Sequence, residues 1–161
     1  MHSRIFQISK TPINKECYLN KDTLTQEYDS YFDYYLEIND KLRKYNINCL
    51  VERVLPKGMF ELTSENTMRY NGGLEQWKES FVADIRKKAE AINTANMMEC
   101  MGPLYQLENT LKDPFDTAYL FYLDKEGIQS YAEHSFAFIN FIHSLEVGAT
   151  LYIGGVIDYH S

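Results

Sequence analysis

The sequence is short of cysteine, and the cysteines it has are not paired. Only three occur in 161 residues, at Cys17, Cys49 and Cys100, and none belongs to a Cys-x-x-Cys motif. This spacing excludes the zinc-ribbon and thioredoxin-like patterns, which need two cysteines close together. We therefore expect reduced thiols in a cytoplasmic protein, with no metal and no cofactor.

Long hydrophobic runs are also missing. The first apolar stretch ends at Ile8, before Ser9 and Lys10, which is too short for the apolar region of a secretory signal peptide. No stretch approaches the ~20 apolar residues that a helix needs to span a bilayer. We expect no contact with a membrane.

Basic residues are scarce in two stretches of the chain. The net charge is −7, and the stretch from Asp22 to Asp40 carries six carboxylates but no Lys or Arg. After Asp113, the single Lys or Arg is Lys125. Binding to nucleic acid requires a basic surface that neutralises phosphates, so this distribution argues against a nucleic-acid partner.

Aromatic residues are abundant instead, at 14% of the chain, with 13 Tyr and 9 Phe. Tyrosine can pack its ring against a core while its hydroxyl group stays in water, so the composition indicates broad amphipathic surfaces. The length suits one domain with a core large enough to fold without a metal or disulfide. No repeat or linker divides the chain, and we predict a single domain over residues 1–161.

Hydrophobic periodicity and turn residues predict an order of strands and helices without strict alternation. Strands are expected over residues 4–9, 31–38, 59–63, 67–70, 117–123 and 150–158. Helices are expected over residues 40–55, 74–92, 94–111 and 130–145. This order predicts an α+β fold, with a small mixed or largely antiparallel sheet covered by about four helices.

Residues 27–38 fit two patterns. As a strand, the segment places Phe32, Tyr34 and Leu36 on one face. As a helix, it forms a stripe of aromatic residues that includes Tyr28 and Tyr35. We favour the strand because Tyr and Phe suit a half-buried sheet.

Three details of the helices are also predicted. Asn39 or Asp40 caps the first helix, Thr94 caps the third, and Ser130 with Glu133 forms a capping box for the last. The pair Gly102-Pro103 is expected to kink or split the third helix. The three methionines near this pair are expected to fill gaps in the core. These are Met97, Met98 and Met101.

The acidic, tyrosine-rich segment is the first candidate for an interaction surface. Its candidate residues are Tyr31, Asp33, Tyr35 and Glu37. Tyrosine offers a large contact area at low entropic cost, and carboxylates select a basic partner. The alternative is a sheet face that is merely solvated.

A possible pocket near the end of the sequence is the second candidate. Gly154-Gly155 interrupts the last predicted strand, which indicates a β-bulge or the close approach of another backbone or a ligand. Asp158 and His160 are two residues apart, so they share one face of a strand and could form an acid–base pair. Two such side chains are too few for a metal site, and a frayed polar terminus is the alternative.

Three segments carry a resemblance to known sequences. Residues 3–9 (SRIFQIS) and residues 152–160 (YIGGVIDYH), with Asp33-Tyr34-Tyr35 between them, resemble a group of small uncharacterised bacterial proteins. The resemblance implies no activity and assigns no catalytic residue.

Two functions therefore stay open at the level of sequence. The first is a non-enzymatic binding or regulatory module that uses the acidic tyrosine-rich surface, with a protein partner or by self-association. The second is a small enzyme or ligand-binding domain with a site near Gly154-Gly155. The absence of a recognisable nucleophile motif favours the first.

Overall fold

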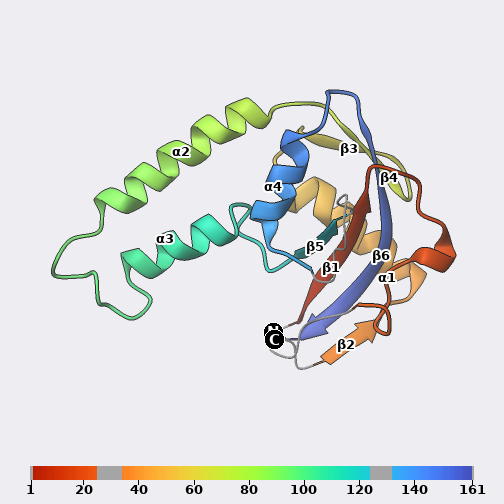
Figure 1. Cartoon of the computed structure of the whole chain (residues 1–161), viewed down its shortest axis with the longest axis horizontal. Helices are drawn as coiled ribbons and strands as arrows, with labels where there is room; N and C mark the ends of the chain where they lie inside the picture. Colours follow the sequence, from red (N-terminus) through yellow and green to blue (C-terminus); the bar gives the residue numbers. More distant parts are fainter. Residues whose placement is uncertain (1, 25–33, 124–131, 161) are drawn as a thin grey trace.

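The structure, a computed structural model, describes residues 2–24, 34–123 and 132–160. Across these ranges the chain forms one open mixed sheet with four α-helices, an α+β fold as predicted (Figure 1). The strands are β1 (His2–Ser9), β2 (Tyr34–Glu37), β3 (Phe60–Ser64), β4 (Thr67–Tyr70), β5 (Leu120–Leu123) and β6 (Thr150–His160). The helices are α1 (Asp40–Cys49), α2 (Leu74–Glu90), α3 (Pro103–Lys112) and α4 (Ser135–His143).

Strand β6 lies at the centre of the sheet. Along one edge it pairs antiparallel with β1, which in turn pairs parallel with β5. Its other edge is shared, because β4 pairs with the first part of β6 and β2 pairs with the last part. Strand β3 completes the sheet beside β4. The segment at 34–37 is thus a strand, as favoured, while residues 31–33 lie outside the described part of the chain.

The sheet buries apolar side chains on both faces. Phe6 and Ile8 of β1 belong to a large core that α1 and α4 cover, whereas Ile5 belongs to a smaller core with Leu19 and Leu24. Successive residues of a strand point to opposite faces, which explains why neighbours on β1 enter different cores. The continuous hydrophobic run in β1 therefore reflects burial on both sides.

Helix α1 starts where the sequence predicts. The side chain of Asn39 accepts a hydrogen bond from the backbone N of Leu42 at 2.9 Å, which satisfies one of the free amides of the first turn. After Cys49 the helix widens into a π-helical turn, η2 (Leu50–Val54). A proline at position 56 follows this turn, consistent with the predicted end near Leu55.

Helices α2 and α3 form a hairpin that projects from the sheet (Figure 1). We refer to residues 74–112 as the arm, and to the rest of the structure as the body. The base of the arm packs on the body through Trp77, whose ring lies 5.5 Å from that of Phe115. Phe115 in turn contacts Phe138 of α4 edge-on at 6.3 Å.

The predicted starts of the last two helices are wrong. Helix α3 begins at Pro103 and not after Thr94, because proline is suited to the first helical position, where its missing N–H costs nothing. Glu133 does not cap α4: its backbone N and O bond to Phe121 at 3.0 and 2.8 Å in a β-bridge. The helix therefore begins at Ser135. Ser130, the other half of the predicted capping box, lies outside the described residues.

The methionines of the loop between α2 and α3 are not in the core. Met97, Met98 and Met101 are 44%, 87% and 68% exposed. The prediction that they fill gaps in the core is wrong, because the arm that carries them extends away from the body (Figure 1).

Candidate functional site

The paired glycines form the β-bulge expected from the sequence. Phe6 lies opposite Val156 and Ile8 opposite Ile153, so Gln7 alone faces both Gly154 and Gly155. A β-bulge of this kind places two residues of one strand opposite one residue of the other.

The space above the two glycines is filled by the chain itself. A Cβ atom on Gly154 would collide with the side chain of Gln7, and one on Gly155 would collide with the backbone of Leu19. The Oε1 atom of Gln7 accepts hydrogen bonds from the backbone N of Gly155 and of Leu19, both at 2.8 Å. The glycines thus admit the segment around Leu19 against the sheet, and a backbone, not a ligand, makes the close approach.

Arg43 of α1 lies on the opposite side of the bulge from Gln7. Its guanidinium donates to the carbonyl oxygens of Ile153 and Gly154 at 2.9 and 2.6 Å, and to Oδ1 of Asn66 at 2.6 Å. These carbonyls belong to the stretch of β6 between its pairing with β4 and its pairing with β2. Burial lowers the pKa of Arg43, and the nearby carboxylate of Asp40 opposes that effect. Arg43 therefore serves as a structural bridge for strand carbonyls that would otherwise lack donors.

Asp158 and His160 share one face of β6, as the sequence indicated, and both belong to the paired strand. The terminus is not frayed up to His160. The carboxylate of Asp158 lies 2.9 Å from Nη1 of Arg4 and 3.0 Å from Nδ1 of His2. The rings of His2 and His160 meet edge-on at 5.2 Å. The antiparallel register explains this cluster, because it sets Arg4 opposite Asp158 and His2 opposite His160.

The geometry of this cluster suits a structural role at the end of the sheet better than a catalytic role. Asp158 is held by Arg4 and His2, so its oxygens are already engaged by two nitrogen donors. Within the described ranges, no group of three or more His, Cys, Asp or Glu side chains could hold a metal ion.

The two regions proposed from the sequence converge on one end of the sheet. Strand β2 sets Leu36 opposite Asp158 and Glu37 opposite Ile157. Tyr35 packs against the smaller core, and Glu37 accepts a hydrogen bond from the backbone N of Lys21 at 3.1 Å. The other two predicted surface residues, Tyr31 and Asp33, lie outside the described part of the chain.

A shallow hollow lies between α1 and the β3–β4 hairpin. Its volume is about 290 Å³, and it is lined by Lys44, Ile47, Asn48 and residues 62–65. Lys44 and Glu65 form an ion pair of 2.6 Å at its rim, which lowers the pKa of Glu65. Lys44 and Glu65 neutralise each other, so the hollow carries no net charge that would select an ionic ligand.

The arm has the least packing of any large element in the fold. Between residues 74 and 112, Leu74 and Gly102 alone are buried. Several large apolar side chains of the arm are more than 40% exposed. They are Val82, Met97, Met98, Met101, Leu104, Tyr105 and Leu111. Sequence reasoning identified the helices but missed this surface, because periodicity shows which residues share a face and not whether anything covers it.

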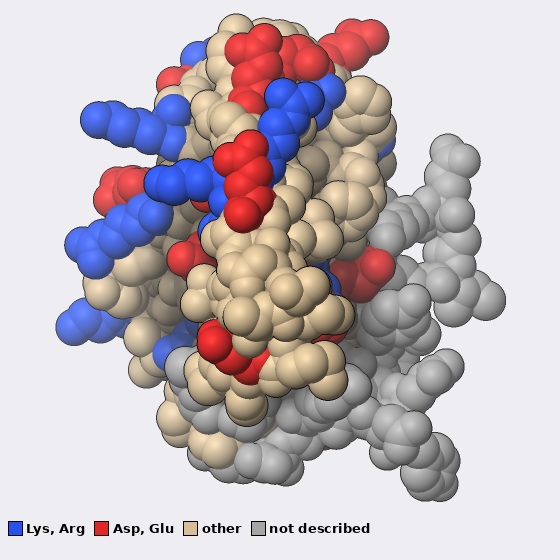
Figure 2. Space-filling model, turned by 90° about the vertical axis from the view of Figure 1, so that its left-hand side faces the viewer, with Lys and Arg blue, Asp and Glu red and all other residues tan. Residues whose placement is uncertain are grey.

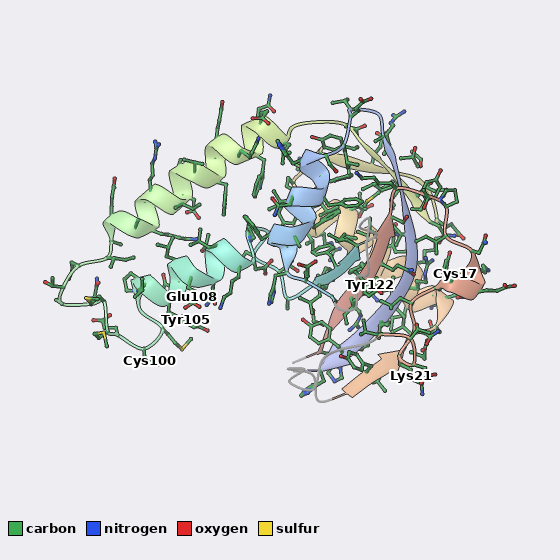
Figure 3. The ribbon with its side chains drawn as sticks, in the orientation of Figure 1. Cys17, Lys21, Cys100, Tyr105, Glu108 and Tyr122 are labelled. Atoms are coloured by element: carbon green, nitrogen blue, oxygen red, sulfur yellow. The ribbon has the colours of Figure 1, made fainter. Side chains whose placement is uncertain are left out.

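The figures show how this surface is presented. Figure 2 looks onto the end of the arm, where uncharged side chains occupy the centre and basic side chains project along one flank. Figure 3 shows Cys100 in the loop at the tip, and Tyr105 and Glu108 on the side of α3 that faces away from α2. Cys17, Lys21 and Tyr122 lie in the body, far from the tip.

Comparison of the chain with protein-family models, with curated proteins and with solved structures gives no match. The resemblance of the two terminal segments to small uncharacterised proteins therefore stays a prediction. The helices of the described residues are too short or too polar to cross a membrane. The candidate site therefore rests on the geometry of the fold alone, and the exposed apolar arm is the most unusual feature of that fold.

The arm is anchored to the body at its C-terminal end by Asp113. Its carboxylate accepts hydrogen bonds from the hydroxyl group of Ser135 and, at 2.6 Å, from the backbone N of Thr117. Burial raises the pKa of Asp113 above its ordinary value, and the two hydrogen bonds partly offset this. Trp77 lies in the first turn of the arm and Asp113 directly after its last residue, so these attachments lie at the base. Among the described residues, the tip makes no comparable contact with the body.

Proposed function

We propose that this chain is a non-enzymatic binding module that recognises a protein partner through the arm. The observation that carries the proposal is the exposure of an extended apolar surface on two packed helices. Monomeric proteins rarely leave such surfaces uncovered, and large exposed apolar patches mark interaction sites. Methionine-rich surfaces in particular suit contact with other proteins, because the thioether side chain adapts its shape.

The structure favours binding over catalysis for two reasons. The space above Gly154 and Gly155 is occupied by the chain itself, and Asp158 is engaged by Arg4 and His2. A catalytic acid or base needs access to a substrate, which neither arrangement provides.

The acidic, tyrosine-rich segment remains a second proposed contact surface. Tyr35 is half-buried, whereas Tyr105 of the arm is 45% exposed. Contact residues of a binding surface must reach the partner, so the arm is the stronger choice.

Site-specific photo-crosslinking in the cell tests the proposal. A photoreactive phenylalanine derivative replaces Leu111, which is 46% exposed on the arm, or, as a matched control, Lys57, which is exposed on the body. We expect a discrete protein adduct from position 111 that is absent from position 57. We also expect Leu104→Glu to abolish the adduct with little change in thermal stability, because Leu104 is nearly half exposed. Identical adduct patterns from the two positions would overturn the proposal.

A further inference from the structure

Each helix of the arm carries an apolar stripe whose side chains are exposed or half-buried. On α2 the stripe consists of Val82, Ile85 and Ala89. On α3 it consists of Leu104, Leu107 and Leu111. Both sets have the spacing i, i+3, i+7, the pattern of positions that face one another in helical bundles and coiled coils.

The two stripes lie on the same face of the arm. The helices touch where Nζ of Lys88 reaches Oγ1 of Thr110 at 2.8 Å. At about 100° per residue, each stripe lies roughly 90° round its helix from that contact. The helices run in opposite directions (Figure 1), so rotations of the same sense bring both stripes to one side. The arm therefore presents one composite apolar face, half of a helical bundle.

We infer that this face binds a second copy of the same chain, with the two α2 helices antiparallel about a two-fold axis near Val82. The inference rests on the proposed function of the arm and names its partner. In this arrangement Val82 of each copy meets Ile85 of the other, and Lys78 lies over the small Ala89. Such a contact is self-complementary, as a two-fold interface requires.

Charges beside the stripe of α2 support this partner and this direction. Glu79 and Arg86 both lie on the outer flank of the stripe, at equivalent heptad positions. Neither forms an ion pair within the described residues, unlike the flanking pairs Glu75–Lys78 and Asp84–Lys88. Antiparallel pairing sets Glu79 of each copy beside Arg86 of the other, twice by symmetry. Parallel pairing in register would instead set like charges at the same level, which is unfavourable.

The size of the face fits a weak, reversible dimer. Helix α2 has 17 residues. At 1.5 Å per residue it is about 25 Å long, and two helices side by side are about 20 Å wide. Two such faces bury on the order of 1,000 Å² in total, the lower limit for a specific interface. Because the arm projects from the sheet (Figure 1), two antiparallel arms can meet with the bodies at opposite ends.

Sedimentation equilibrium of the purified full-length chain tests the inference over about 1–500 μM, a range chosen for interfaces near the lower size limit. We expect a reversible monomer–dimer equilibrium. Val82→Glu should abolish the dimer, since it places a charge in the middle of the apolar face. Ser80→Glu adds the same charge about 200° round the helix from Val82, and should leave the equilibrium unchanged.

A charge exchange distinguishes the antiparallel pair from any other contact. Glu79→Arg alone and Arg86→Glu alone should each weaken the dimer about 10-fold, because two ion pairs become two repulsions. The double variant should restore the affinity of the original chain. Failure of the double variant to recover would overturn the antiparallel arrangement, even where the chain is dimeric.

A chain that is monomeric at every concentration would overturn self-association. The proposed function would still stand in that case if crosslinking at position 111 captured a different protein that Leu104→Glu releases. A monomeric chain without arm-specific adducts would overturn both.

Discussion

At the scale of single residues, Arg43 holds together parts of the chain that are distant in sequence. Its guanidinium joins α1 to Asn66 of the β3–β4 turn and to the carbonyls of Ile153 and Gly154 in β6. The planar guanidinium spreads five donors over a rigid fork and so reaches carbonyls and an amide that lie apart, for which the compact ammonium of lysine is less suited. The bulge at Gly154-Gly155 is thus held by two side chains: Arg43 donates to the carbonyl of Gly154, and Oε1 of Gln7 accepts from the backbone N of Gly155.

Replacement of Arg43 should therefore lower the free energy of unfolding by more than its partial burial suggests. We expect Arg43→Met to lower the free energy of unfolding by about 1–3 kcal/mol, because it leaves strand carbonyls without a donor. The neighbouring Lys44→Met removes only an exposed ion pair with Glu65 and should lower the stability much less. Urea denaturation followed by circular dichroism measures both. Equal losses in the two variants would show that Arg43 is an ordinary surface residue.

At the scale of elements, the attachment of the arm should depend on pH through Asp113. Its pKa is raised in the folded protein, mainly by burial, so the folded state holds the proton more tightly than the unfolded state. The contribution of this group to stability is complete below its unfolded pKa and is lost as pH rises through the folded pKa. The stability of the original chain relative to Asp113→Asn should therefore decrease as the pH rises through and above the ordinary pKa of aspartate, about 3.9.

Urea denaturation of both proteins at a series of pH values checks this expectation. Asn cannot ionise, so the difference between the two curves isolates the titration of Asp113. A difference that grows in favour of the original chain with rising pH would mean that the hydrogen bonds from Ser135 and Thr117 outweigh burial.

The elements that the sequence predicted well are those that local patterns determine. The side chain of Asn39, the turn before α2 and the apolar spacing within α2 act over a few residues, and the structure confirms each of them. Gly72 and Gly73 both have φ near +90°, a conformation that other residues rarely adopt, so they end the β4 segment and open α2.

The elements that the sequence predicted poorly depend on distant partners. Helix α4 starts later than predicted because Glu133 forms a β-bridge with Phe121 of β5, twelve residues earlier in the chain. The role of Arg43 could not be predicted, since the carbonyls that it binds lie at Ile153 and Gly154. Likewise, the burial of Met98 depends on where the arm points, and that direction is set by contacts of its base.

At the scale of the whole molecule, the fold consists of two parts with very different packing. The body buries apolar side chains on both faces of its sheet, whereas the arm is joined to it mainly at the base, where Leu74, Trp77 and Asp113 lie. Regions with few buried contacts open locally without unfolding the rest of a protein. The arm should thus behave as a separate unit of low stability that gains order when it binds.

Native-state hydrogen exchange should resolve the two parts. In dilute solution the amides of α2 and α3 should exchange through local openings that respond little to low concentrations of urea, while those of β1 and β6 exchange only through global unfolding. At concentrations where the chain dimerises, protection should rise in both α2 and β6, because local opening of the arm and global unfolding both break the interface. Val82→Glu should remove this concentration dependence and leave the exchange of β6 in dilute solution as it was. Arm amides that are as protected as those of β6 in dilute solution would show that the arm belongs to the body's cooperative unit, with no need of a partner to order it.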